Sequence, residues 1–233
     1  MKIALLGYGR MGKTIERIAV KRGHDIVLKI DNNHAMFDIC QAEIAIDFSD
    51  PSAAYHNLKN CIENDIPVVC GTTGWLTKYD EIVDFCNRKQ GAFIYASNFS
   101  VGVNLFFNLN AYLAKMMKNL KDYDVTMEEI HHIHKLDAPS GTAITLAEQV
   151  LENSSKKQWK IDNAAADDLH IHVKREDEVP GTHSIQYKSE VDAIEIKHTA
   201  FNREGFALGA VIAAEWLVNK KGVFGMNDVL NIH

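Results

Sequence analysis

The first hundred residues alternate short apolar runs with stretches that have helical spacing. The apolar runs cover residues 2–6, 26–30, 44–48, 67–70 and 92–96, and they predict strands. Helices are predicted over residues 14–21, 51–63 and 79–89, the second of them started by Ser49, Asp50 and Pro51. Buried parallel strands are typically continuous apolar runs, so the alternation predicts an α/β unit with a parallel sheet covered on both faces.

The pattern changes after residue 102. A long amphipathic helix is predicted over residues 103–119, followed by strands of alternating polarity over 124–132, 170–175, 183–188 and 192–198. Such strands indicate an open mixed sheet with one face on helices and one face exposed. An exposed face is a candidate for oligomerisation, and we expect a homotetramer. Residues 153–168 are polar and predict a mobile surface connection, residues 205–219 predict a helix, and residues 222–230 close the chain.

Composition narrows the class of protein. With 233 residues and 46% hydrophobic content, the chain can form one large or two modest globular domains. A net charge of -6 argues against nucleic acid as a partner. No apolar run reaches the roughly 18 residues of a membrane span, and MKIALLGYGR indicates a strand rather than a signal peptide, so we expect a cytoplasmic protein without membrane contact. The four cysteines have neither metal nor redox spacing.

A glycine turn lies between the first strand and the first helix. It contains Gly7, Tyr8, Gly9, Arg10, Met11 and Gly12. In a dinucleotide-binding unit the first glycine makes the turn, the second lets the backbone approach the pyrophosphate, and the third packs the helix against the strand. Gly7, Gly9 and Gly12 fit these three positions, so a dinucleotide site is predicted here.

Asp31 ends the second strand, where a carboxylate can accept hydrogen bonds from the adenosine ribose and repel a 2'-phosphate. Asn32 and Asn33 follow it without an arginine, which favours NADH over NADPH. Arg10 and Lys13 could still reach such a phosphate. Residues 31–34 could also form a simple polar turn.

Two further loops follow strands of the predicted parallel sheet, at the edge where ligands bind in such sheets. Residues 71–74 read GTTG and can place backbone and hydroxyl groups near a nicotinamide ribose. In the loop over residues 97–102, Phe99 could contact the nicotinamide ring or be a buried hinge residue.

Residues 128–148, EEIHHIHKLDAPSGTAITLAE, concentrate ionisable side chains near a strand end. His131, His132, His134 and Lys135 lie within five positions, and Pro139 and Ser140 begin a helix at Gly141 and Thr142. A helix N-terminus attracts anions, and histidine donates protons near neutral pH. The combination indicates a carboxylate substrate that receives a proton.

Other interpretations of these histidines remain open. A histidine at such a position can be a hydrogen-bonded structural residue, and adjacent residues of a strand point to opposite faces, so His131 and His132 do not share a face unless the strand ends or bulges. We assign His134 no role. The HHxH spacing matches no common closed zinc site, so we expect no metal.

These motifs together resemble the dihydrodipicolinate reductases. The resemblance spans the chain and rests on GYGRMG, DFS, GTTG, SNFSVGVN, EIHHIHKLDAPSGTA, GTHSIQY and HTAFNREGFALGA. It implies a Rossmann-like dinucleotide-binding domain over residues 1–100 and 203–233, with a substrate-binding and oligomerisation domain inserted at 101–202. The implied reaction is hydride transfer from NADH or NADPH to the cyclic dicarboxylate formed from 4-hydroxy-tetrahydrodipicolinate, giving tetrahydrodipicolinate for diaminopimelate and lysine biosynthesis.

The resemblance also implies roles for individual residues. His131 and Lys135 match residues assigned as proton donors, His132 matches a substrate-binding position, and Gly141 and Thr142 match the pair that holds a substrate carboxylate. The implied cofactor contacts are Gly7, Tyr8, Gly9, Arg10, Met11, Gly12, Asp31, Gly71, Thr72, Thr73, Ala96, Ser97, Asn98 and Phe99. Two alternatives are a related NAD(P)-dependent amino or imino acid dehydrogenase and a dinucleotide-binding sensor without catalysis.

Overall fold

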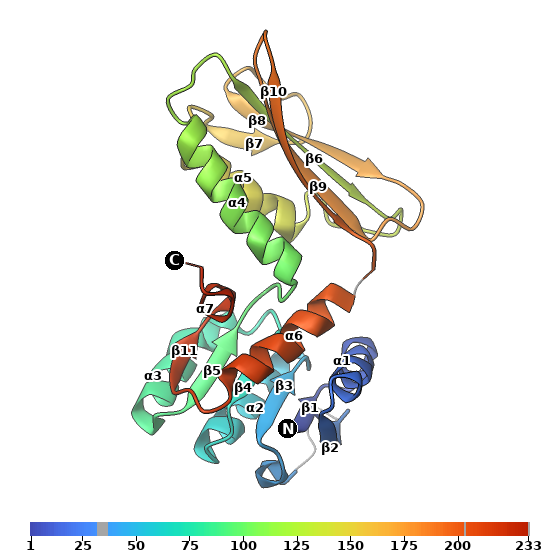
Figure 1. Ribbon diagram of the computed structural model, residues 1–233, viewed down its shortest axis with the longest axis vertical. Coiled ribbons are helices and arrows are strands. Elements are labelled where there is room, and N and C mark those ends of the chain that lie inside the picture. Colours follow the sequence, from blue (N-terminus) through green and yellow to red (C-terminus); the bar gives the residue numbers. More distant parts are fainter. Residues whose placement is uncertain (32–36, 203, 233) are drawn as a thin grey trace. The chain divides into compact units, whose positions relative to one another are not determined.

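The chain folds into two compact units. The computed structural model describes residues 1–31, 37–202 and 204–232. The first unit comprises residues 1–104 and 204–233, and the second comprises residues 105–203. Each unit has its own sheet (Figure 1).

The first unit is built on a six-stranded, fully parallel sheet in the order β11-β5-β4-β3-β1-β2. Its strands are β1 (Lys2–Leu6), β2 (Asp25–Ile30), β3 (Ile44–Asp47), β4 (Val68–Cys70), β5 (Ala92–Tyr95) and β11 (Gly222–Phe224). Its helices are α1 (Arg10–Lys21), α2 (Pro51–Glu63), α3 (Tyr79–Lys89), α6 (Glu204–Leu217) and α7 (Met226–Leu230), with short 3-10 turns η1 (Ile39–Gln41) and η2 (Leu76–Lys78).

Helices cover both faces of this parallel sheet, because the strand side chains alternate between two apolar clusters. Ile3 and Leu5 of β1 point toward α1 and α6, in a cluster that includes Ile15. Ala4 and Leu6 point to the other side, toward α2 and α3. The predicted α/β fold with a covered parallel sheet is therefore confirmed.

The strand order reverses at β1, which has β2 on one side and β3 on the other. In open α/β sheets this switch point forms a crevice at the carboxyl ends of the strands, where ligands bind. The turn after β1 and the turn after β3 meet there: a Cβ at Gly7 would lie 2.1 Å from the carbonyl oxygen of Phe48.

The second unit contains a five-stranded mixed sheet in the order β10-β9-β6-β8-β7. Its elements are α4 (Val101–Met117), which begins in the first unit, and β6 (Asp124–His131), α5 (Gly141–Leu151), β7 (Gln158–Lys160), β8 (Asp168–Arg175), β9 (Gly181–Lys188) and β10 (Ala193–Ala200). Strand β6 runs antiparallel to β9 and parallel to β8.

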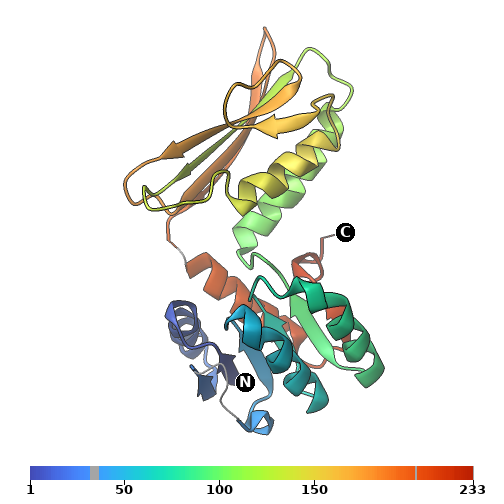
Figure 2. The ribbon, with the colours of Figure 1, turned by 180° about the vertical axis from the view of Figure 1, so that it is seen from behind.

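One face of the mixed sheet packs on α4 and α5 (Figure 2). Leu113, Leu146, Ile171 and Ile185 belong to this core. The other face has a polar depression of about 240 Å³, lined by Thr126, Met127, Glu128, His172, Ser184, Gln186 and Glu195. The predicted open sheet is confirmed, but this part of its free face is polar rather than the apolar patch assumed in the argument for oligomerisation.

Several element boundaries differ from those predicted. The stretch over residues 153–168 was expected to be a mobile connection, but it contains β7, which pairs with β8. The last residues form both β11 and α7, and α1 begins at Arg10 rather than Thr14. Among the described residues, no helix combines the length and apolarity needed to cross a bilayer.

Candidate active site

The glycine turn after β1 has the geometry of a dinucleotide-binding turn. Gly7 has a φ of 93°, which favours glycine, and a Cβ at Gly12 would lie 2.3 Å from the carbonyl oxygen of Gly7. Gly9 caps α1 and has no atom within 4 Å of its Cβ position, so its backbone faces open space. The turn is therefore tight where the helix meets the strand and open at the helix start, where a phosphate can approach.

The turns after β3 and β4 are joined through the buried carboxylate of Asp47. The hydroxyl of Thr72 donates to Asp47 Oδ1 at 2.5 Å, and the amide of Asn57 donates to Asp47 Oδ2 at 2.7 Å. The N–H of Ser49 in turn donates to the Thr72 hydroxyl at 2.9 Å. Burial raises the pKa of Asp47, although these hydrogen bonds oppose the shift.

This network changes how two predicted cofactor residues can act. The hydroxyl of Thr72 donates to Asp47 inside the protein, and the carbonyl oxygen of Thr72 accepts from the Trp75 indole at 2.8 Å, so the Thr72 side chain is directed into the protein rather than toward a ligand. Phe99 is 1% exposed and packs against Phe48. Of the two alternatives for Phe99, the structure places the ring in the core.

The other predicted cofactor residues lie at the same edge of the parallel sheet. Asp31 directly follows β2 and is exposed, while Gly71, Thr73, Ala96, Ser97 and Asn98 occupy the turns after β4 and β5. The Tyr8 hydroxyl donates to Glu16, and its ring lies beneath Lys13 and Lys29. Residues Asn32, Asn33 and His34 lie outside the described residues, so the argument from a missing arginine stays a prediction.

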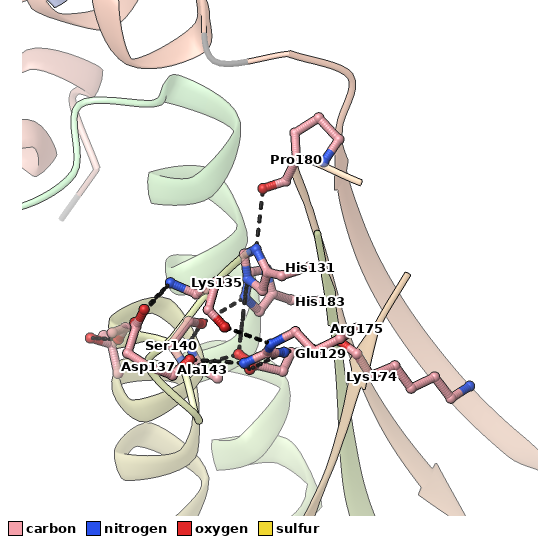
Figure 3. Close-up of polar contacts among 12 residues, drawn as sticks. Glu129, His131, Lys135, Asp137, Ser140, Ala143, Lys174, Arg175, Pro180 and His183 are labelled. Carbon is pink, nitrogen blue, oxygen red and sulfur yellow. Dashed lines mark hydrogen bonds and ion pairs between the residues drawn. The ribbon is translucent and has the colours of Figure 1, made fainter. Parts of the chain in front are cut away.

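In the second unit, three strands place ionisable side chains at the same end of the sheet. Glu129 and His131 of β6 share its helix-covered face, because they are two residues apart. In the strand register Glu129 lies opposite His183 of β9, and His131 lies opposite Arg175 of β8. The four side chains therefore converge (Figure 3).

The ring of His131 is buried and is held at both nitrogens. Its Nδ1 lies 3.2 Å from the carbonyl oxygen of Pro180, and its Nε2 lies 3.4 Å from Nε2 of His183. A carbonyl oxygen can only accept, so Nδ1 carries a hydrogen in both charge states of His131. The proton that His131 gains or loses is thus on Nε2.

Glu129 is fully buried and has a partner at each carboxylate oxygen. Arg175 donates to Oε1 through Nη1 and Nη2, each at 3.2 Å, and the N–H of Ser140 donates to Oε2 at 2.9 Å. Arg175 also donates to the carbonyl oxygens of Lys135 and Asp137, at 3.3 and 2.8 Å. It therefore ties the loop after β6 to the buried carboxylate.

Helix α5 begins beside this cluster, as the sequence predicted. Ser140 is its N-cap: the hydroxyl accepts from Ala143 N at 3.2 Å and lies 3.1 Å from His183 Nε2. Gly141 and Thr142 are the first two helical residues, and no atom lies within 4 Å of a Cβ at Gly141. Backbone N–H groups in a first helical turn lack partners within the helix, so this start can receive an anion.

Lys135 lies in the loop between β6 and α5, where its Nζ binds both carboxylate oxygens of Asp137 at 2.7 Å (Figure 3). This ion pair lowers the pKa of Asp137. His132 follows β6 and is half-buried, and its ring centroid lies 6.2 Å from that of His134, which is exposed beside Glu178.

The surroundings of the two buried imidazoles, His131 and His183, lower the pKa of both. Burial lowers the pKa of His183 to about 4, with a smaller contribution in the same direction from His131. Burial also lowers the pKa of His131, while the Glu129 carboxylate opposes that shift. The pKa of Glu129 itself is lowered: burial acts to raise it, but hydrogen bonds from Ser140 and the electrostatic attraction of the two histidines together outweigh burial.

Glu129, His131 and His183 each place one donor atom within 4.8 Å of the others, close enough in principle for a cation. The guanidinium of Arg175 already binds Glu129, and a second positive charge there would meet its repulsion. We assign no metal to this cluster, and the absence of a metal stays a prediction.

Glu129, Arg175 and His183 belong to this cluster but were not predicted as site residues, unlike His131, His132, Lys135, Gly141 and Thr142. A signal for them is present in the strands. The inward face of β6 runs from Val125 and Met127 to Glu129, that of β8 from Ile171 and Val173 to Arg175, and that of β9 from Ile185 to His183. Three apolar faces that become ionisable at one sheet end indicate a shared site.

Comparison with known families matches both parts of the chain. A family model described as dihydrodipicolinate reductase, N-terminus, matches residues 1–99, and one described as dihydrodipicolinate reductase, C-terminus, matches residues 102–230. This chain belongs to the dihydrodipicolinate reductase family. The resemblance predicted from the motifs is thus confirmed.

Curated relatives of this dihydrodipicolinate reductase match over nearly the full length. The 4-hydroxy-tetrahydrodipicolinate reductase of Christiangramia forsetii is 57% identical over 99% of this chain and 98% of its own. That of Thermosipho africanus is 34% identical, with the same coverage. Among solved structures, the dipicolinate-bound dihydrodipicolinate reductase from Paenisporosarcina sp. TG-14 has a TM-score of 0.80 at 20% identity, covering 97% of both chains, which shows a common fold.

The same fold occurs in other dehydrogenases. Diaminopimelate dehydrogenase of C. glutamicum aligns with a TM-score of 0.53 at 12% identity, over 100% of this reductase and 94% of that chain. At this identity the likeness shows the fold alone, and function has to be argued from the site.

Proposed function

We propose that this reductase transfers a hydride from a nicotinamide dinucleotide to the cyclic dicarboxylate formed from 4-hydroxy-tetrahydrodipicolinate, with His131 as the proton donor. The reductase class follows from the family, and the names of its curated relatives support the substrate. The single observation that carries the role of His131 is its position beside a buried carboxylate, with Nδ1 committed to Pro180.

His131 meets the physical requirements of a general acid. Its Nε2 carries the exchangeable proton, and Glu129 Oε2 lies 4.0 Å away, near enough to stabilise the charged ring. Such a donor works best when its pKa is close to the operating pH, and an imidazole needs little adjustment to meet this condition. His131 therefore supplies the proton that quenches the charge left by hydride addition to a conjugated imine.

Lys135 and the start of α5 suit the carboxylates of such a substrate. The ammonium of Lys135 is paired with the carboxylate of Asp137. The Asp137 side chain is exposed, so a carboxylate of the ligand can take its place. Gly141 and Thr142 offer backbone N–H groups, and a helix start favours negative charge. His132 borders the same loop. We assign these four residues to substrate binding, with Lys135 also as fixed positive charge or second proton donor.

The first unit suits a nicotinamide dinucleotide, which supplies the hydride when bound. Gly7 and Gly12 close the turn, and Gly9 leaves room at the start of α1 for a pyrophosphate. Gly7–Gly12, Gly71–Thr73 and Ala96–Asn98 contribute mainly backbone contacts in this proposal. Asp31 is exposed at the end of β2. Its carboxylate accepts hydrogen bonds from the ribose hydroxyls and repels a 2'-phosphate, which favours NADH over NADPH.

The direct test is oxidation of NADH and of NADPH, followed at the nicotinamide absorbance, with the substrate generated in place from pyruvate and aspartate semialdehyde by the preceding synthase. Oxidation that depends on the synthase supports the proposal, and the ratio of the two rates tests Asp31. If protein that binds a dinucleotide oxidises neither cofactor, the related dehydrogenase or the non-catalytic sensor becomes the better assignment.

The homotetramer and the cytoplasmic location remain proposals. The helix-free face of the second sheet is the surface we propose for assembly, and its polar side chains require that hydrogen bonds, rather than apolar burial, contribute much of the contact. Light scattering of the purified protein distinguishes a tetramer from a monomer.

A further inference from the structure

We infer that Glu129 is a positioning residue for His131: its buried negative charge keeps the exchangeable proton on His131 Nε2. The inference rests on the proposed role of His131 as the proton donor. The Glu129 carboxylate has 0% exposure at the end of an otherwise apolar strand face, which the reaction alone does not explain.

A buried carboxylate is costly, and this one is held by dedicated partners. Both oxygens are occupied, by Arg175 and by the N–H of Ser140, so the group has a fixed position. From that position Oε2 lies 4.0 Å from His131 Nε2 and 3.8 Å from His183 Nε2. The carboxylate is therefore directed at the nitrogens whose protonation changes.

Charged groups act on His131 from its own strand, from β8 and from the loop after β6. Arg175 of β8 and Lys135 of the following loop are positive and oppose a proton on His131, whereas Glu129 of its own strand favours one. Asp137 is bound to Lys135, and Ser140 of α5 and Pro180 before β9 are uncharged. Glu129 is thus the carboxylate that pairs with His131 Nε2, at 4.0 Å.

His183 completes the arrangement as a neutral neighbour. Burial keeps its pKa at about 4, so near neutral pH it offers His131 Nε2 a hydrogen-bonding nitrogen rather than a second positive charge. A proton shared between the two rings therefore resides on His131. Removing the charge of Glu129 leaves the Arg175 guanidinium near His131 without the carboxylate that it binds, and the ring loses its proton at lower pH.

The test replaces Glu129 with Gln, which keeps the shape and can still accept from Ser140. A general acid must be protonated, so kcat/KM falls as pH rises through its pKa. In Glu129→Gln we expect this fall at a pH about one unit or more lower, with activity recovered toward acid pH. Glu129→Asp, which keeps the charge, should return the profile most of the way to that of the parent. Exposed Glu178→Gln is the matched control and should leave the profile unchanged.

A second readout separates this inference from the proposed function. The ring proton signals of His131, assigned by their loss in His131→Gln, are titrated by NMR in the free enzyme. A lower pKa of His131 in Glu129→Gln supports the inference, even if the pH profile of kcat/KM does not move. An unmoved rate profile together with that lower pKa would instead exclude His131 as the proton donor. Two results would overturn the inference. One is that Glu129→Gln loses activity equally at every pH while the pKa of His131 stays unchanged. The other is that Glu129→Asp shows the same pH profile as Glu129→Gln.

Discussion

Glu129 and His183 face each other across the antiparallel pair β6 and β9, and the carboxylate Oε2 lies 3.8 Å from the imidazole Nε2. An anion at that distance favours a charged imidazole, yet burial has the larger effect and keeps His183 neutral. His183 is therefore protonated less readily in the folded protein than in the unfolded chain.

Stability should consequently fall in acid through His183. The pKa of an unfolded histidine is about 6.5 and that of folded His183 is about 4, so its contribution is complete above pH 6.5 and is lost as pH falls to about 4. The loss from this residue is about 3 kcal/mol. Urea unfolding at pH 8, 6 and 4.5 should show a smaller acid loss for His183→Gln than for the parent. Parallel pH dependences for the two proteins would contradict the assignment.

Replacing His131 with Gln should lower kcat by a factor on the order of 10², because a general acid is lost. Dinucleotide affinity, measured by fluorescence titration, should change little, since His131 lies in the second unit. His134→Gln serves as the matched control, because His134 is exposed and contacts only Glu178 among the ion pairs described. Near-normal turnover of His131→Gln would exclude this histidine as the proton donor.

Two glycines of the same turn should respond differently to alanine. Gly12→Ala places a Cβ against the Gly7 carbonyl and should destabilise the first unit by about 2 kcal/mol in urea unfolding. Gly9→Ala meets no atom within 4 Å and should cost less than about 1 kcal/mol. It should still weaken dinucleotide binding by about tenfold, since the methyl group occupies the proposed approach of the pyrophosphate. Unchanged affinity in Gly9→Ala would place the pyrophosphate elsewhere.

Asp31→Ala should reduce the affinity for NADH more than that for NADPH, because the carboxylate accepts from the ribose hydroxyls and repels a 2'-phosphate. Asp25→Ala, at the opposite end of the same strand, is the matched control. Isothermal titration of both cofactors measures the two losses. Equal losses for NADH and NADPH would mean that Asp31 does not contact the ribose.

The sequence predicted most of the fold because its signals are local. Continuous apolar runs identified β1 to β5, and period-two alternation identified β6 and β8 to β10. Strand β7 was missed because only three residues of a polar stretch pair with β8, too few to show a period. Strand β11 was missed because it too has only three residues, and because its partner β5 is more than a hundred residues away along the chain.

The site was predicted where its residues are adjacent in sequence and missed where they are not. His131, Lys135 and the start of α5 fall within one motif. Arg175 and His183 reach it only through the register of β6 with β8 and β9, which no single segment specifies. For Thr72 and Phe99 the local motif was right about the turn but could not tell that their side chains face inward.

The Asp47 network has a consequence for how the family varies. Thr72 and Asn57 both donate to one buried carboxylate, so a change at any of the three positions removes a hydrogen bond from a buried polar group. Single replacements should therefore be rare, and relatives that depart from aspartate at position 47 should also have altered positions 57 and 72. These three positions, well separated in the chain, are expected to covary as a set.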